Sequence, residues 1–252
     1  MKFLRILKGI LVMMVVLALA GLTFWVWYNL VRQTPVEQST KEQAHLRDTQ
    51  EKLLKENMAE KDQYKYIVLI NPSHGGKDAG EKSADRTEKE VTLAIAKKVQ
   101  ELNTNKQIGV FLIRNEDVDV DETIRRAFIE GLEPDLFIDL HVGKKPQVDT
   151  AGTTVYYTTD YYNPKLTNVE LADMMERSVV TAIEGVATGI FEDTEGKYTL
   201  LENTGCPSVA IEAGCLAGEV EGVLLGRESY QENIAKGMLE TIYEAYKRTG
   251  DI

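Results

Sequence analysis

Two histidines and a glutamate follow or end short apolar runs in the sequence. Side chains at the ends of strands in an α/β sheet are well placed to bind metals and to transfer protons. After residue 63 the chain contains only two histidines, His74 and His141, and they follow or end runs that predict buried strands, 67–70 and 135–141. Glu212 ends a third such run. The carboxyl ends of parallel strands lie at one edge of a sheet, so we expect these side chains to meet there. A single histidine at a strand end is more often structural, but three converging groups favour chemistry.

A fourth group, Glu88, begins the helix that follows the His74 loop. Residues 87–90 have the capping-box pattern, in which a threonine caps the helix and Glu90 reaches back to it. The helix macrodipole explains an acidic residue in a first turn, but Glu90 already serves the cap and Glu88 starts at the same sheet edge. Two imidazoles and one carboxylate with an open fourth position are the ligand set of a hydrolytic zinc site. We therefore predict that His74, Glu88 and His141 hold zinc (Zn2+).

Glu212 is then available for a different role. A carboxylate beside such a metal acts as a base toward the attacking water and as an acid toward the leaving group. The alternative is a structural residue at a strand end, paired with a neighbouring cation.

The elements that must position these residues alternate along the chain. A strand, a helix, a second strand, a second helix and a third strand follow one another, which is the pattern of a parallel α/β sheet. We predict an α/β fold, a three-layer sandwich with a mostly parallel sheet, preceded by a transmembrane helix and a helical spacer. The expected strands are 67–70, 109–113, 135–141, an edge strand at 153–158, and 207–212; the expected helices are 87–102, 121–132, 166–184 and 229–247, with a loop at 190–205.

The amino-terminal segment predicts membrane attachment. Residues 9–30 carry no charge, and 22 residues are enough to cross about 30 Å of hydrocarbon. Three cationic residues precede the segment, which favours a cytoplasmic amino terminus and a catalytic domain on the extracytoplasmic side. Residues 18–20 have the small-x-small pattern of a signal peptidase site. The apolar run continues beyond them with Trp25 and Trp27, so we expect a single-pass anchor in the cell membrane that is not cleaved.

Composition limits the partners. Residues 1–32 hold four basic and no acidic side chains, which leaves −15 of formal charge on the remainder and argues against nucleic-acid binding. Residues 33–63 favour helix by propensity, but their apolar stripe is too thin for a coiled coil. We interpret them as a solvated spacer, with a helix that binds a regulatory partner as the alternative. Cys206 and Cys215 are expected to be packing residues, because a strand between them separates the two thiols.

Four segments together resemble one family of enzymes. Residues 66–248 resemble the zinc-dependent N-acetylmuramoyl-L-alanine amidases often called Amidase 3. Where that family has Asp-Pro-Gly-His-Gly-Gly, residues 71–76 read NPSHGG, and its Glu-Lys-x-Val-Thr-Leu helix start matches EKEVTL at 88–93. The family's Ser-Ile-His-Ala-Asn corresponds to DLHVG at 139–143, and its Pro-Ala-Val-Leu-Val-Glu-x-Gly-Phe strand to PSVAIEAGC at 207–215.

The resemblance implies a peptidoglycan hydrolase that cleaves the amide bond between N-acetylmuramic acid and L-alanine of the stem peptide. It implies zinc ligands at His74, Glu88 and His141 and a catalytic carboxylate at Glu212. Arg125 lies where the family has an arginine, and we carry it as a substrate-binding candidate. The expected domains are an anchor at 1–32, the charged spacer at 33–63 and the zinc amidase domain at 64–252.

Several positions depart from the family pattern without changing a predicted ligand. Asn71 replaces an aspartate beside the metal loop, Asp139 adds a carboxylate just before His141, and Val142-Gly143 replaces Ala-Asn. Glu130 and Cys215 also differ from the usual residues. These changes concern the charge around the metal and the contacts to substrate.

Two other functions fit parts of the sequence. One is a catalytically silent amidase-like domain that binds cell-wall glycan or a membrane partner, although such a module has no need of Glu212. The other is a zinc peptidase that cuts within the stem peptide, for which no HExxH motif is present.

Overall fold

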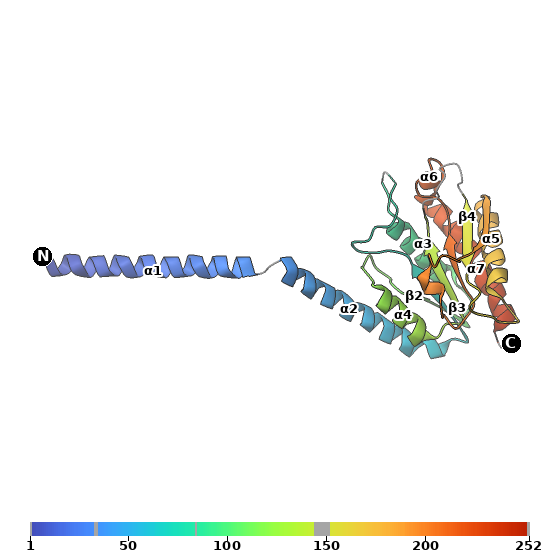
Figure 1. The fold of residues 1–252 in the computed structure, drawn as a ribbon, viewed down its shortest axis with the longest axis horizontal. Helices are drawn as coiled ribbons and strands as arrows, with labels where there is room; N and C mark the ends of the chain where they lie inside the picture. Colours follow the sequence, from blue (N-terminus) through green and yellow to red (C-terminus); the bar gives the residue numbers. More distant parts are fainter. Residues whose placement is uncertain (1, 33–34, 84, 144–151, 251–252) are drawn as a thin grey trace. The chain divides into compact units, whose positions relative to one another are not determined.

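A six-stranded sheet forms the centre of the folded part of the chain (Figure 1). The computed structural model describes residues 2–32, 35–83, 85–143 and 152–250. Contacts divide the chain into two units, Met1–His45 and Leu46–Ile252. The strands are β1 Tyr66–Pro72, β2 Ile108–Leu112, β3 Leu136–His141, β4 Thr153–Tyr157, β5 Ala187–Glu192 and β6 Ser208–Glu212. The α-helices are α1 Lys2–Arg32, α2 Pro35–Glu60, α3 Glu88–Leu102, α4 Glu122–Leu132, α5 Asn168–Ile183, α6 Glu221–Leu225 and α7 Glu228–Thr249, with short 3-10 turns η1 Lys61–Gln63 and η2 Thr199–Leu201.

The sheet is mostly parallel, as the sequence predicts. Its strands lie in the order β2-β1-β3-β6-β4-β5. β1 pairs in parallel with β2 and β3, and β3 pairs in parallel with β6. β4 runs antiparallel to β6, and β5 is parallel to β4. The three strands that end on the predicted site therefore lie side by side, in the order β1, β3, β6.

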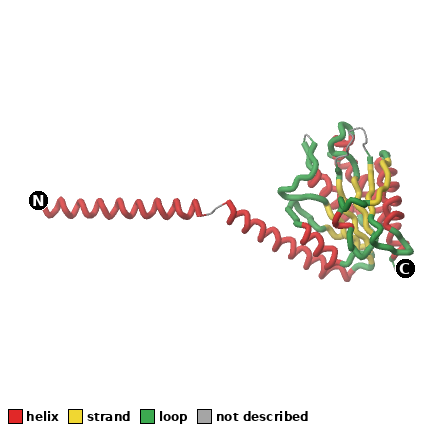
Figure 2. Tube along the Cα trace, viewed as in Figure 1, coloured by secondary structure: helices red, strands yellow, loops and turns green. Residues whose placement is uncertain are grey.

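Helices cover both faces of the sheet, which gives the three predicted layers (Figures 1 and 2). Alternate residues of β1 enter two different apolar cores. Val68 and Ile70 pack with α3, α5 and α7, whereas Ile67 and Leu69 pack with α4 and the η2 turn. Cys206 and Cys215 are buried free thiols, which confirms that they are packing residues.

Two details of the predicted sheet are wrong. The strand expected at an edge, β4, lies inside the sheet between β6 and β5. The second half of its outer neighbour β5, residues 190–192, falls where we expected a loop, because this strand contains Gly189 and none of its residues is buried, so it lacks a buried apolar run. A strand whose pairing comes from a distant segment gives little local signal in the sequence.

The unit Met1–His45 contains the apolar helix α1. Within it, Lys8–Tyr28 has a mean hydropathy of 2.5 and is long and apolar enough to cross a membrane. A signal sequence near an amino terminus can have the same length and apolar character. The helix agrees with the predicted span in length and composition.

Helix α2 covers most of the predicted spacer, and the structure confirms that this segment is helical. Its second half belongs to the folded unit that begins at Leu46. Leu53 and Leu54 pack against the core on the α4 side, and Lys61 donates to the Gly131 and Leu132 carbonyls at 3.2 and 3.3 Å. Residues 46–63 therefore pack on and hydrogen-bond to the domain. The predicted domain boundaries themselves stay a prediction.

Candidate metal centre and active site

The predicted site residues meet at the carboxyl edge of the sheet. His74 follows β1, His141 ends β3 and Glu212 ends β6. His141 and Glu212 are register partners. Glu88 is the first residue of α3, and the capping box predicted for this helix is present, with Thr87 N donating to the Glu90 carboxylate at 2.9 Å. Three strand ends and one helix start therefore bring together four residues that are far apart in the sequence.

Three of these side chains form a compact cluster that could hold a metal ion. His74 Nε2 lies 3.1 Å from Glu88 Oε2, and His141 Nδ1 lies 3.2 Å from Glu88 Oε1. One donor atom from each residue lies within 4.8 Å of the other two. Two imidazole nitrogens and one carboxylate oxygen are donors that zinc prefers. The residues present therefore fit a zinc ion.

Glu88 is buried and fixed by more than the histidines. Its Oε1 accepts from Ser73 Oγ at 3.3 Å and from Val142 N at 3.2 Å, and its Oε2 accepts from Glu81 N at 3.0 Å. Gly80 makes room for this arrangement, because a Cβ at this position would lie 2.6 Å from Glu88 Oε2. Only the backbone of residue 80 fits beneath the His74 and Glu88 side chains.

Each histidine also has a second carboxylate partner. His74 Nδ1 lies 2.7 Å from Asp78 Oδ2, so this ring presents Nε2 to Glu88. His141 Nε2 lies 3.2 Å from Asp139 Oδ1, so this ring presents Nδ1 instead. Carboxylates behind metal-binding histidines fix the tautomer and orientation of the ring. Such partners are typical of a metal centre.

The electrostatics of the cluster favour positive charge at its centre. Burial opposes the charged form of Glu88, but hydrogen bonds from His141 and His74 outweigh it and hold the pKa of Glu88 well below its usual range. Burial would also lower the pKa of His141, whereas Asp139 and Glu88 raise it to about 10. The pKa of His74 is raised as well, by Glu88 and Asp78 against the effect of burial. Metal binding takes neutral imidazoles and releases these protons.

One carboxylate oxygen of Glu212 accepts hydrogen bonds, and the other has no hydrogen-bond partner among the described residues. Lys197 Nζ donates to Glu212 Oε1 at 2.8 Å, and Tyr198 Oη donates to the same oxygen. Glu212 Oε2 is buried and has no hydrogen-bond partner among the described residues. Gly143 leaves space for it, because a Cβ there would lie 1.6 Å from Oε2. The glycine that departs from the family pattern is the residue that this placement of Glu212 requires.

Arg125 lies behind the His74 loop rather than free in the cleft. Its guanidinium donates to Asn71 Oδ1, to the Val120 carbonyl at 3.0 Å and to the His74 carbonyl at 3.0 Å. It is 9% exposed. These contacts hold the loop that carries a predicted ligand, and a role toward substrate stays a prediction.

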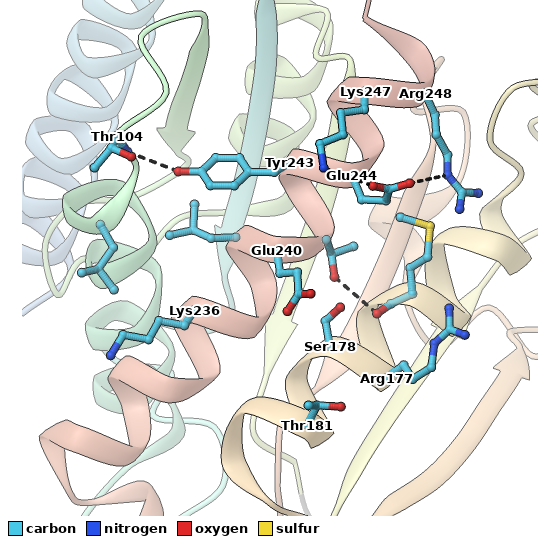
Figure 3. A pocket seen from close by; sticks show the side chains of 14 residues that line it. Thr104, Arg177, Ser178, Thr181, Lys236, Glu240, Tyr243, Glu244, Lys247 and Arg248 are labelled. Atoms are coloured by element: carbon cyan, nitrogen blue, oxygen red, sulfur yellow. Dashed lines mark hydrogen bonds and ion pairs between the residues drawn. The ribbon is translucent and has the colours of Figure 1, made fainter.

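A small cleft opens over the site. Its volume is about 240 Å³, and it is lined by Asn71, Ser73, His74, Asp78, Asp119, Val120, Glu122, Arg125, Asp139, His141, Lys197, Tyr198, Thr199 and Leu200. A larger pocket of about 790 Å³ lies over α3, α5 and α7, where Lys236, Glu240 and Tyr243 project from α7 (Figure 3). None of the predicted site residues lines the larger pocket. The chemistry therefore belongs to the smaller cleft.

Sequence reasoning missed Lys197 and Tyr198. Both precede η2 in the segment that we expected to be a loop, and they reach Glu212 from 15 and 14 positions away. The Tyr198 ring also packs against His141, with 5.3 Å between ring centroids. No local motif links the two residues to Glu212, so the sequence gave no indication that they belong to the site.

Comparison with known proteins gives a consistent result. A family model described as N-acetylmuramoyl-L-alanine amidase matches residues 68–244. The chain is 26% identical over 199 residues to the germination-specific N-acetylmuramoyl-L-alanine amidase of Bacillus subtilis (strain 168), which covers 73% of this chain and 81% of that protein. It is 25% identical over 179 residues to the endolysin of Bacillus phage SPP1, covering 71% of this chain and 65% of that protein.

Solved structures have the same fold. The N-acetylmuramoyl-L-alanine amidase from Clostridium difficile 630 matches with a TM-score of 0.67 and 26% identity, over 73% of this chain and 98% of that one. The CwlD amidase from Clostridioides difficile, in complex with the GerS lipoprotein, matches with a TM-score of 0.65 and 24% identity, over 72% of this chain and 98% of that one.

Proposed function

This chain belongs to the N-acetylmuramoyl-L-alanine amidase family, and we propose that it performs the family's reaction with zinc held by His74, Glu88 and His141. As a member of that family, it is a peptidoglycan hydrolase that cleaves the amide bond between N-acetylmuramic acid and L-alanine of the stem peptide. The observation that supports the metal most directly is the closeness of the three donor atoms, all within 4.8 Å of one another. A zinc ion in such a site polarises a carbonyl and makes water nucleophilic near neutral pH.

Glu212 is proposed as the group that moves the proton. Lys197 and Tyr198 fix Oε1, so the carboxylate keeps one orientation. Oε2 has no partner among the described residues and can accept a hydrogen bond from the attacking water. It takes the proton when the water oxygen bonds to the lactyl carbonyl carbon. It returns this proton to the alanine nitrogen when the carbon–nitrogen bond breaks.

Arg125 and Asp78 would hold the loop rather than touch the reacting atoms. Arg125 donates to the His74 carbonyl, and Asp78 lies 2.7 Å from His74 Nδ1. Together they fix both the backbone and the ring of this ligand. The alternative of a silent binding domain has no observation in its favour among the described residues, since every catalytic-type position is filled.

We propose that residues 9–30 anchor the enzyme in the cell membrane. Three cationic residues precede this segment, which favours an amino terminus in the cytoplasm and a catalytic domain on the outer side, where peptidoglycan lies. A similar amidase has been solved in complex with a lipoprotein. We keep the binding of a regulatory partner through residues 33–63 as a proposal of the same kind.

Muropeptide analysis tests the reaction and the metal together. The full chain in detergent is divided into three samples, one untreated, one treated with a chelator, and one treated with a chelator and then supplied with zinc, and each sample is incubated with purified peptidoglycan. We expect mass spectrometry to find stem peptides with a free L-alanine amine, their loss after chelation, and their return with zinc. Cuts within the stem peptide would contradict the amidase reaction, unchanged release after chelation would contradict the metal, and no release at all would favour the silent domain.

A further inference from the structure

A carboxylate and an amide face each other across β1 and β3, next to the proposed ligands. Asn71 and Asp139 are register partners, and Asn71 Nδ2 donates to Asp139 Oδ1 at 2.7 Å. Both side chains are buried, at 2% and 3% exposure. The two departures from the family pattern are therefore one feature. The carboxylate absent from β1 is present on the neighbouring strand, two residues before His141.

His141 uses its two ring nitrogens in opposite directions. Nδ1 lies 3.2 Å from Glu88 Oε1, at the centre of the ligand set, and Nε2 lies 3.2 Å from Asp139 Oδ1. A neutral imidazole carries one proton, and the other nitrogen holds the lone pair that can bind a metal. The lone pair lies on Nδ1 only if the proton lies on Nε2. A carboxylate acceptor at Nε2 stabilises that tautomer.

We infer that Asp139 is a positioning residue of the metal centre, which accepts a hydrogen bond from the protonated Nε2 of His141 and thereby presents Nδ1 of this ring to zinc. The inference rests on the proposed zinc site. It adds to that site a residue that is not one of the three predicted ligands. Asp139 touches neither the metal nor the substrate in this assignment. It acts through His141.

The hydrogen bonds behind Asp139 fix its own orientation. The Arg125 guanidinium donates to Asn71 Oδ1, which leaves the Asn71 amide nitrogen to donate to Asp139. Arg125 therefore donates to Asn71, and Asn71 donates to the Asp139 carboxylate. His141 donates to the same carboxylate from the other side. A buried network in which each of these groups is satisfied holds a unique arrangement.

The competing explanation is that Asp139 only balances the charge of Arg125. The guanidinium contacts are to Asn71 and to the carbonyls of Val120, Pro72 and His74. Among the described residues, the Asp139 carboxylate instead has its hydrogen-bond and ion-pair contacts with Asn71 and His141. The geometry thus favours the contact with the histidine over the contact with the arginine.

Two substitutions separate these explanations. Asp139→Leu removes the acceptor and keeps the branch at Cγ in a larger side chain, and Asp139→Asn keeps an acceptor oxygen and the size of the side chain while it removes the charge. Zinc affinity is measured by competition with a chelator on the full chain in detergent. We expect Asp139→Leu to bind zinc about 10- to 100-fold more weakly, the usual effect of losing such a partner. Asp139→Asn should lose clearly less. With cobalt in place of zinc, the visible spectrum should change in Asp139→Leu.

Ile138→Ala is the matched control. Ile138 lies on the same strand, is fully buried and packs on the opposite face of the sheet. It should lower the melting temperature and leave the zinc affinity and the cobalt spectrum unchanged. Unaltered zinc affinity in Asp139→Leu, or equal losses in the leucine and asparagine variants, would overturn the positioning role. If the unmutated chain binds no zinc, the proposed function fails, and this inference fails with it.

Discussion

Two buried glutamates lie at the same edge of the sheet, and their surroundings differ. Glu88 has partners on both oxygens: two imidazoles, two backbone amides and one hydroxyl. Glu212 has both of its partners, Lys197 and Tyr198, on Oε1, whereas its Oε2 has none among the described residues. Their exposed fractions are similar, 2% and 6%. Burial alone therefore does not distinguish the proposed metal ligand from the proposed proton-transfer group.

The difference indicates what each role needs. A ligand must keep one geometry, and five donors leave Glu88 no alternative orientation. A proton-transfer group needs a fixed carboxylate with one oxygen whose partner can change during the reaction. An unpartnered buried oxygen is costly, by about 1–3 kcal/mol. Such a cost is typical of a functional site rather than of a structural strand end.

Each glutamate also depends on a glycine. A Cβ at Gly80 would lie 2.6 Å from Glu88 Oε2, and a Cβ at Gly143 would lie 1.6 Å from Glu212 Oε2. Gly80 has φ +62°, a conformation that most other residues avoid. The space around both carboxylates therefore depends on the absence of a side chain at these two glycines. If either glycine were replaced, a substitution elsewhere could not restore that space.

Glu88→Ala should have the largest effect. It removes one of the three proposed protein ligands and leaves two, and two ligands rarely hold zinc in a hydrolytic site. We expect zinc content to fall from about one ion per chain to background, and muropeptide release to stop. Metal analysis of the purified full chain measures the first result. Full zinc occupancy in this variant would remove Glu88 from the ligand set and erase the distinction between the two glutamates.

Glu212→Gln should separate turnover from metal binding. The amide keeps the shape of the side chain but cannot act as a base. Zinc should stay, and turnover should fall about 10² to 10⁴-fold, because the attacking water loses its proton acceptor and the leaving nitrogen its donor. Zinc content, melting temperature and muropeptide release are measured on one preparation. Near-normal release with a lowered melting temperature would instead make Glu212 a structural residue.

Gly143→Ala should mimic part of that loss without replacing an ionisable group. The added methyl group would meet Glu212 Oε2 and displace the carboxylate. A misplacement on the order of 1 Å can reduce turnover about 10²-fold. If the effect acts through Glu212, adding Gly143→Ala to Glu212→Gln should reduce release little further. Fully additive losses in the double variant would show that the glycine serves another part of the site.

The sequence predicted those features of the site that are local. Strand ends placed His74, His141 and Glu212 at one edge, and a capping box assigned Glu90 to the helix start, which left Glu88 free to face the cluster. Apolar runs identified the buried strands because their side chains pack on both faces of the sheet.

Features that depend on distant pairing could not be predicted in this way. The exposed strand β5 has no buried run, so the position of β4 inside the sheet was missed. Lys197 and Tyr198 reach Glu212 from a segment without a motif. Asn71 and Asp139 were recognised separately as departures, but their pairing follows from the register of β1 and β3, which no local pattern gives.

Glu90→Ala should have the smallest effect and tests whether neighbouring carboxylates in one helical turn have separate roles. Glu90 is exposed, and its carboxylate accepts from Thr87 N at 2.9 Å and from Thr87 Oγ1 at 2.7 Å. Loss of a capping contact costs about 1 kcal/mol, which lowers the melting temperature of a domain of this size by about 2–4 °C. Zinc content and turnover should stay normal, since the hydrogen bonds of the Glu90 carboxylate in the described structure are to Thr87 and not to the proposed ligands. Calorimetry and metal analysis on the same sample measure both quantities. Loss of zinc at an unchanged melting temperature would mean that Glu90, two residues from Glu88, belongs to the metal centre and that the cap does not divide the two roles.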